Sequence, residues 1–129
     1  MADLIEYLRE RLDEDEAMAR AALTSDRWQA DEGCVYADEE ILHRAGEPYA
    51  GIQVLVAEHV ARWDPARVLA EVAAKRRIVN AYVAIVEDYD AEDWHLAGRR
   101  DELADVLVDL AQPYADWDDF DLAWKLASD

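Results

Sequence analysis

The chain has 129 residues, and its 31 acidic and 13 basic side chains give a formal net charge of −18. Hydrophobic residues make up 53% of the sequence, which excludes an intrinsically disordered chain. The single cysteine, Cys34, excludes an internal disulfide and a multi-cysteine zinc site. We therefore expect one domain over residues 1–129, because this length suits a domain with a core of its own.

The charge and the apolar pattern also exclude several classes of partner. A net charge of −18 repels nucleic-acid phosphates and anionic membranes. The first residues are acidic and amphipathic, unlike a secretory signal, and no apolar stretch approaches the ~20 residues that cross a bilayer. We expect a cytoplasmic protein that binds neither nucleic acid nor membranes directly.

Residues 3–23 have the pattern of an amphipathic helix. Asp3 stands where a side chain caps the first turn, and Glu6 follows three positions later, as in a capping box. Apolar residues recur along one face of this helix at Leu4, Leu8, Leu12, Ala19 and Leu23.

The segment 28–45 is predicted to form two short strands joined by an acidic turn. Val35 and Tyr36 belong to the first apolar run, and Ile41 and Leu42 belong to the second. Because a two-stranded hairpin is marginally stable alone, we expect it to lie against helices. The acidic neighbours of Cys34 favour a small buried hydrophobe over a reactive thiol.

Two helices are predicted next, over residues 52–63 and 65–86. Asp64 can cap the second of them, and Pro65 suits its first position. Ile78 and Ile85 widen the apolar stripe of this long helix, so we expect it to be central to the core. In the shorter helix, the stripe predicted to face inward consists of Ile52, Leu55, Val56, His59, Val60 and Trp63.

The last third of the chain is predicted to contain an acidic linker, a helix and an aromatic tail. The linker covers 87–93, and the helix covers 100–112 and ends before Pro113. We expect the acidic tail 113–129 to pack back on the domain, with a short helix over 118–125. The predicted fold is therefore mainly α: a small bundle of about four helices with a short β-hairpin insertion.

The candidate binding residues lie around a concentration of basic residues between 62 and 77. These cations can pair with acidic segments of the chain, or they can bind an anion beside the start of the 65–86 helix. His59 can be a metal ligand or general base beside Glu58 or Asp64, or a half-buried side chain that donates to a carboxylate or carbonyl. The candidate residues are His59, Arg62, Asp64, Arg67 and Arg76.

The central stretch 57–78, AEHVARWDPARVLAEVAAKRRI, resembles the signature of a small uncharacterised family. The opening residues 8–16 and the closing residues 110–116, with Trp124 downstream, are also similar to that family, whereas 24–50 diverges. The family is a domain of unknown function found in actinobacteria and their phages. The resemblance therefore implies a context, an accessory role against or within a bacterial host, and no particular reaction.

We interpret the chain as a non-enzymatic acidic interaction protein with a protein partner. In one version, carboxylates of the tail mimic nucleic-acid phosphates and occupy a basic site on a host protein. The alternatives are a metal-dependent hydrolase that combines clustered carboxylates with His59, and a structural homodimer. We expect no catalytic residue, metal site or cofactor in the interaction protein. The predicted acidic surface is made of Asp116, Asp118, Asp119 and Asp121.

Overall fold

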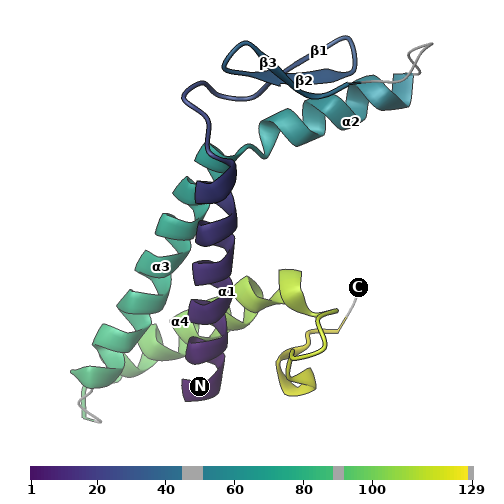
Figure 1. The fold of residues 1–129 in the computed structure, drawn as a ribbon. Helices are drawn as coiled ribbons and strands as arrows, with labels where there is room; N and C mark the ends of the chain where they lie inside the picture. Colours follow the sequence, from purple (N-terminus) through teal and green to yellow (C-terminus); the bar gives the residue numbers. More distant parts are fainter. Residues whose placement is uncertain (45–50, 89–91, 128–129) are drawn as a thin grey trace. The chain divides into compact units, whose positions relative to one another are not determined.

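The computed structural model describes residues 1–44, 51–88 and 92–127. Within these ranges the chain forms four α-helices and one small antiparallel sheet, as the mainly α prediction with a short β insertion requires (Figure 1). None of the helices in these ranges is both long enough and apolar enough to cross a membrane. The helices are α1 (Ala2–Ala22), α2 (Gly51–Arg62), α3 (Pro65–Glu87) and α4 (Trp94–Ala111).

The residues group into two compact units, and each is described by itself. Unit 1 comprises residues 1–13 and 73–129, and unit 2 comprises residues 14–72. Helices α1 and α3 each contribute one part to both units. The organisation of residues 1–129 as a single domain stays a prediction.

Unit 1 has a core of leucine and valine side chains. The four-residue period of α1 is confirmed at Leu4, Leu8 and Leu12, which are each 1–2% exposed. Leu23, expected on the same face, lies beyond the end of α1 and is 48% exposed. Val79 of α3 and Leu107 of α4 are buried to the same degree. At the surface, Asp13 of α1 accepts a hydrogen bond of 2.6 Å from Arg76 of α3, and Arg9 donates one of 3.4 Å to Asn80. These two side-chain contacts join α1 to α3 within this unit.

Helix α4 begins six positions before the predicted start at residue 100. Its first residue is Trp94, and the carboxylate of Asp93 caps it by accepting hydrogen bonds from the amides of His95 and Leu96, at 3.0 and 3.3 Å. The predicted start was wrong because the prediction relied on apolar periodicity, which begins only at Leu103. The observed start is determined by a single capping side chain, that of Asp93. The helix ends at Ala111, next to Pro113, close to where the sequence predicts.

The tail of unit 1 forms two short 3-10 helices, Gln112–Tyr114 and Leu122–Trp124, in place of the helix expected over 118–125. Its aromatic rings meet α1 at Tyr7, whose ring lies 6.0 Å from Phe120 and 5.2 Å from Trp124. The amide of Gln112 bonds the tail directly: Nε2 donates to the carbonyl of Trp124 at 2.8 Å, and Oε1 accepts from the amide of Leu126 at 3.1 Å. These contacts, rather than a continuous helix, fix the tail.

Unit 2 contains a three-stranded sheet in the order β1 (Gln29–Asp31), β2 (Cys34–Ala37) and β3 (Glu40–His43). Both pairs of neighbouring strands are antiparallel. The prediction of two strands was therefore wrong by one strand. The first predicted strand is divided by a turn at Glu32 and Gly33 into β1 and β2, whereas the predicted acidic turn before Ile41 is the observed turn between β2 and β3.

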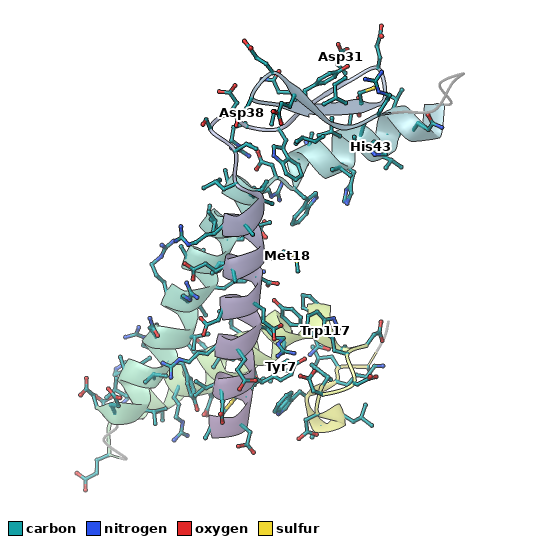
Figure 2. The ribbon with its side chains drawn as sticks, viewed as in Figure 1. Tyr7, Met18, Asp31, Asp38, His43 and Trp117 are labelled. Carbon is teal, nitrogen blue, oxygen red and sulfur yellow. The ribbon has the colours of Figure 1, made fainter. Side chains whose placement is uncertain are left out.

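Both turns of the sheet have two central residues with positive φ, as type I′ hairpin turns require. In the first turn these are Glu32 at 48° and Gly33 at 80°, and in the second they are Asp38 at 52° and Glu39 at 64°. The second turn is the acidic turn that the sequence predicts, and it has no glycine. It is held by Asp38, whose carboxylate accepts from the amides of Ser25 at 2.9 Å and Asp26 at 2.7 Å (Figure 2).

The sheet packs on the small-residue face of α2 (Figure 1). Val35 of the central strand is completely buried against Ala57 and Ala61, which are 1% and 9% exposed. Alanines four residues apart leave room for a sheet to approach the helix closely. The free thiol of Cys34 is also buried, as predicted.

The prediction that the apolar stripe of α2 faces inward was wrong. Leu55 is 66% exposed, Val56 49% and Trp63 44%, and His59 is also exposed. Of the described stripe residues, Val60 is half-buried beside the sheet, and the side chain of the predicted stripe residue at position 52 lies outside the described part. The alanine face contacts the sheet, so the larger apolar side chains remain on the outer side of α2.

Candidate functional site

Asp64 organises the junction between α2 and α3 in unit 2. Its carboxylate caps α3 by accepting from the amide of Arg67 at 3.0 Å, and its carbonyl accepts from the amide of Val68 at 3.1 Å. The same carboxylate accepts two hydrogen bonds from the guanidinium of Arg27 and one from the amide of Trp28. The predicted role of Asp64 as a helix cap is therefore confirmed.

The environment of Asp64 shifts its acidity. The side chain is 1% exposed, and this burial alone would raise the pKa of the carboxyl group. The hydrogen bonds from Arg27 and from the amides of Arg67 and Trp28 outweigh burial, so the pKa of Asp64 lies below its ordinary value. Asp64 is thus a negatively charged structural group with its acceptor positions occupied, which leaves it little capacity to bind a ligand.

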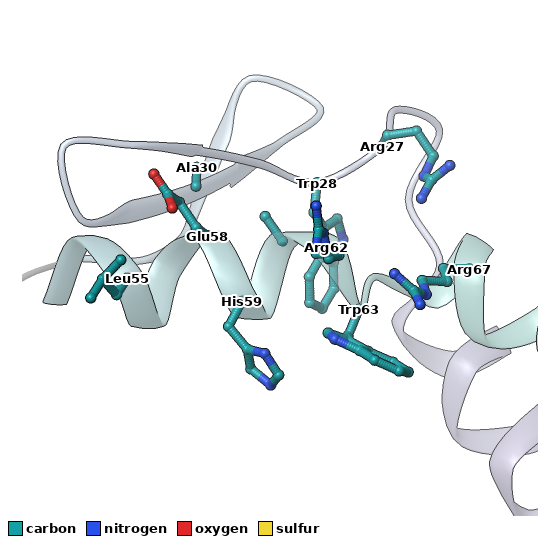
Figure 3. A pocket seen from close by; sticks show the side chains of 10 residues that line it. Arg27, Trp28, Ala30, Leu55, Glu58, His59, Arg62, Trp63 and Arg67 are labelled. Carbon is teal, nitrogen blue, oxygen red and sulfur yellow. The ribbon is translucent and has the colours of Figure 1, made fainter. Parts of the chain in front are cut away.

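An open groove of about 770 Å³ lies beside this junction, along α2 (Figure 3). It is lined by apolar and aromatic side chains together with three arginines and one carboxylate, that of Glu58. We name it the Trp63 groove. The lining side chains used below are Arg27, Leu55, Glu58, His59, Arg62, Trp63 and Arg67.

The Trp63 groove contains three of the predicted binding residues, His59, Arg62 and Arg67. The guanidinium of Arg67 lies 4.0 Å from the centroid of the Trp63 ring, and its Nε donates to Glu71 at 3.1 Å. Arg62 is exposed, and among the described residues it has neither a hydrogen bond nor an ion pair. The groove therefore offers one cation held against an aromatic ring and one cation whose partner can come from outside.

His59 lies on the same side of α2 as Trp63, with their ring centroids 6.2 Å apart (Figure 3). The imidazole of His59 is exposed, which contradicts the interpretation of this residue as a half-buried side chain. Among the described residues, no group of three or more histidine, cysteine, aspartate or glutamate side chains is placed to hold a metal ion.

The remaining predicted binding residue, Arg76, lies in unit 1 rather than in the groove. Its guanidinium is 2.6 Å from the carboxylate of Asp13, an acidic residue of α1. The sequence indicates two alternatives for the basic residues, pairing with acidic segments of the chain or binding an anion. Arg76 follows the first of these. The arginines that line the groove belong to unit 2.

The four predicted acidic residues of the tail divide into two pairs. Asp119 accepts from Arg11 at 2.8 Å and from the hydroxyl of Tyr7 at 3.3 Å, and Asp121 caps the last 3-10 helix by accepting from the amide of Ala123. Asp116 and Asp118 are exposed. Two of the four carboxylates thus support the fold of the tail, and the other two point to solvent.

Sequence reasoning missed two arginines, Arg27 and Arg11, whose partners lie far away in the sequence. Arg27 bonds Asp64 across 37 positions of sequence, and no local pattern signals that pairing. Arg11 is 7% exposed, with its guanidinium 5.0 Å from the ring centroids of both Tyr7 and Trp117. Its position on the leucine face of α1, next to Leu12, was the one available signal.

Comparison with known proteins places the chain in a family without assigning an activity. The model of a "Family of unknown function (DUF6221)" matches residues 1–126. No curated protein and no solved structure gave a match. Because the matched residues cover almost the whole chain, from α1 through the Trp63 groove to the tail, the chain belongs to this family of unknown function, DUF6221.

Proposed function

We propose that this chain is a non-enzymatic interaction protein that binds another protein through the outer face of α2. The observation that carries the proposal is the exposure of Leu55, Val56 and Trp63 on one helix face, at 66%, 49% and 44%. Soluble proteins rarely leave contiguous large apolar side chains in water unless the surface has a binding role. Full burial of such a side chain contributes about 1.5–3 kcal/mol.

The acidic surface supports a second candidate, mimicry of nucleic-acid charge toward a basic site on a partner protein. Asp101, Asp105 and Asp109 are all exposed on α4, and residues four apart on a helix are about 5–6 Å from each other. Asp116 and Asp118 continue this acidic character into the tail. The row on α4 is the better place for mimicry, because Asp105 and Asp109 are exposed there although Asp101 pairs with Arg100. In the tail, Asp119 is bonded to Arg11 and Tyr7 of α1, and Asp121 caps a 3-10 helix.

The resemblance to proteins of actinobacteria and their phages makes a bacterial host protein the proposed class of partner. The test is affinity capture from an actinobacterial lysate with the full chain at about 0.1 M and 0.5 M salt, read by mass spectrometry. The variants are Leu55→Gln with Val56→Gln, and Asp101→Asn with Asp105→Asn and Asp109→Asn. Light scattering on the same samples reports self-association, which is the homodimer alternative.

Loss of one reproducible partner with the α2 variant, and its retention with the α4 variant, is the expected result. Retention with the α2 variant contradicts the proposal. Loss only with the α4 variant, together with release at high salt, favours the mimicry candidate, since screening weakens exposed charge pairs. Circular dichroism of each variant confirms that the helices remain folded.

A further inference from the structure

We infer that the Trp63 groove binds an acidic segment of a partner protein, one that carries a carboxylate beside a large apolar side chain. The inference rests on the proposed function and adds the chemistry of the partner. It starts from the cations of the groove: the chain carries −18 overall, yet the lining includes three arginines, of which Arg27 and Arg67 are paired with Asp64 and Glu71, and Arg62 is exposed. Charge complementarity therefore favours an anionic group at this position.

The three arginines have different availability. The guanidinium of Arg27 is bonded to Asp64, and that of Arg67 is stacked on Trp63 and bonded to Glu71. Arg62 is exposed, and within the described part of the chain no group accepts from its guanidinium. An incoming carboxylate can therefore form a two-pronged hydrogen-bonded pair with Arg62 without breaking an internal contact.

Apolar surface adjoins this cation. Trp63, one residue further along the chain, is 44% exposed, and Leu55 lines the same groove and is 66% exposed. A leucine, isoleucine or aromatic side chain of the partner would cover these two residues. A bare phosphate would leave Trp63 and Leu55 exposed, and a nucleic acid would be repelled by the net charge of the chain. A short acidic and apolar peptide fits both halves of the groove.

Glu58 limits which acidic segments can bind. It is exposed one helical turn before Arg62 and repels a second carboxylate placed near it. His59, exposed beside Trp63, carries no negative charge and does not add to this repulsion. The structure thus favours a segment with one carboxylate at Arg62 over a long run of acidic residues.

The test uses a random twelve-residue peptide display library and the immobilised full chain. Selected peptides are then synthesised with a fluorescent label, and their dissociation constants are measured by anisotropy. Arg62→Gln and Leu55→Gln are the site variants. Arg99→Gln is the matched control, because Arg99 is an exposed arginine on α4 whose loss changes the net charge equally.

The expected result is selection of peptides with Asp or Glu close to Leu, Ile, Phe or Trp. Arg62→Gln should raise their dissociation constants about tenfold or more, and Arg99→Gln less than about twofold. Failure to select peptides, selection of basic peptides, or equal effects of Arg62→Gln and Arg99→Gln would overturn the inference.

The two proposals can fail separately. If the α2 double variant loses a partner protein but the selected peptides are not acidic, the proposed function stands and this inference is wrong. If acidic peptides bind the groove through Arg62 while the double variant keeps every partner, the groove has the inferred chemistry and the proposed function is wrong.

Discussion

Arg27 donates hydrogen bonds from its guanidinium to both carboxylate oxygens of Asp64, which is 1% exposed at the start of α3. The arginine itself is 62% exposed. The pair therefore consists of a buried anion and a largely hydrated cation, which reduces the desolvation cost relative to a pair in which both charges are buried. It ties the segment before β1 to the junction between α2 and α3.

Replacement of Asp64 should destabilise the chain in proportion to the acceptors that are lost. Asp64→Ala removes the cap and the pair with Arg27, and we expect it to lower the free energy of unfolding by about 3 kcal/mol. Asp64→Asn keeps a capping oxygen and should cost about 1–2 kcal/mol. Urea unfolding measures both, with the exposed Asp105→Asn as a control. Equal effects of the two Asp64 variants would contradict this account.

The stability of the chain should decrease in acid through Asp64. Its pKa in the folded state lies below the ordinary carboxyl value of 3.8, so the folded state binds the proton less readily than the unfolded state. The contribution of Asp64 is therefore present above pH 3.8 and is lost as pH falls through its folded-state pKa. Unfolding of the wild-type chain and Asp64→Asn at a series of pH values measures this. Their stability difference should shrink below pH 3.8, and a constant difference would refute the assignment.

The buried guanidinium of Arg11 should hold the tail against α1. It lies 5.0 Å from the ring centroids of Tyr7 and Trp117 and donates to Asp119 at 2.8 Å. Arg11→Met keeps the apolar stem but removes the charge, and it should cost about 2 kcal/mol. Near-ultraviolet circular dichroism should change, since the aromatic rings lose a shared contact. The exposed Arg99→Met is the control, and an unchanged spectrum of Arg11→Met would contradict the role.

Asp38 should determine the second turn of the sheet. Its carboxylate accepts from the amides of Ser25 and Asp26, and its own φ is 52°. Asp38→Ala removes the acceptor and disfavours the positive φ, so we expect a loss of about 2 kcal/mol. Asp38→Asn tolerates that conformation and should lose less. Thermal unfolding compares them with Asp31→Ala, an exposed change on β1, and a larger effect of Asp31→Ala would count against this role of Asp38.

The predictability of the fold differed between its parts for physical reasons. Long helices such as α1 could be predicted because their leucines repeat with the period of the helix, and Asp64–Pro65 marked the start of α3 through local capping chemistry. The first turn of the sheet was not predicted, because Glu32 and Gly33 lie inside a segment that was interpreted as one strand. The second turn was predicted from its acidic residues, but its hydrogen bonds to Ser25 and Asp26 come from a segment 12–13 positions earlier, which no local pattern indicates.

The sequence by itself determined the helices, the cap at Asp64, the burial of Cys34 and the candidates His59, Arg62 and Arg67 that share one groove. Only the tertiary structure decided which face of α2 is buried and which cations have partners. Helical periodicity gives two faces of α2, an alanine face and a larger apolar face, but not the element that covers either one. The sheet fits closely on Ala57 and Ala61, and for that reason Leu55 and Trp63 remain exposed beside Arg62.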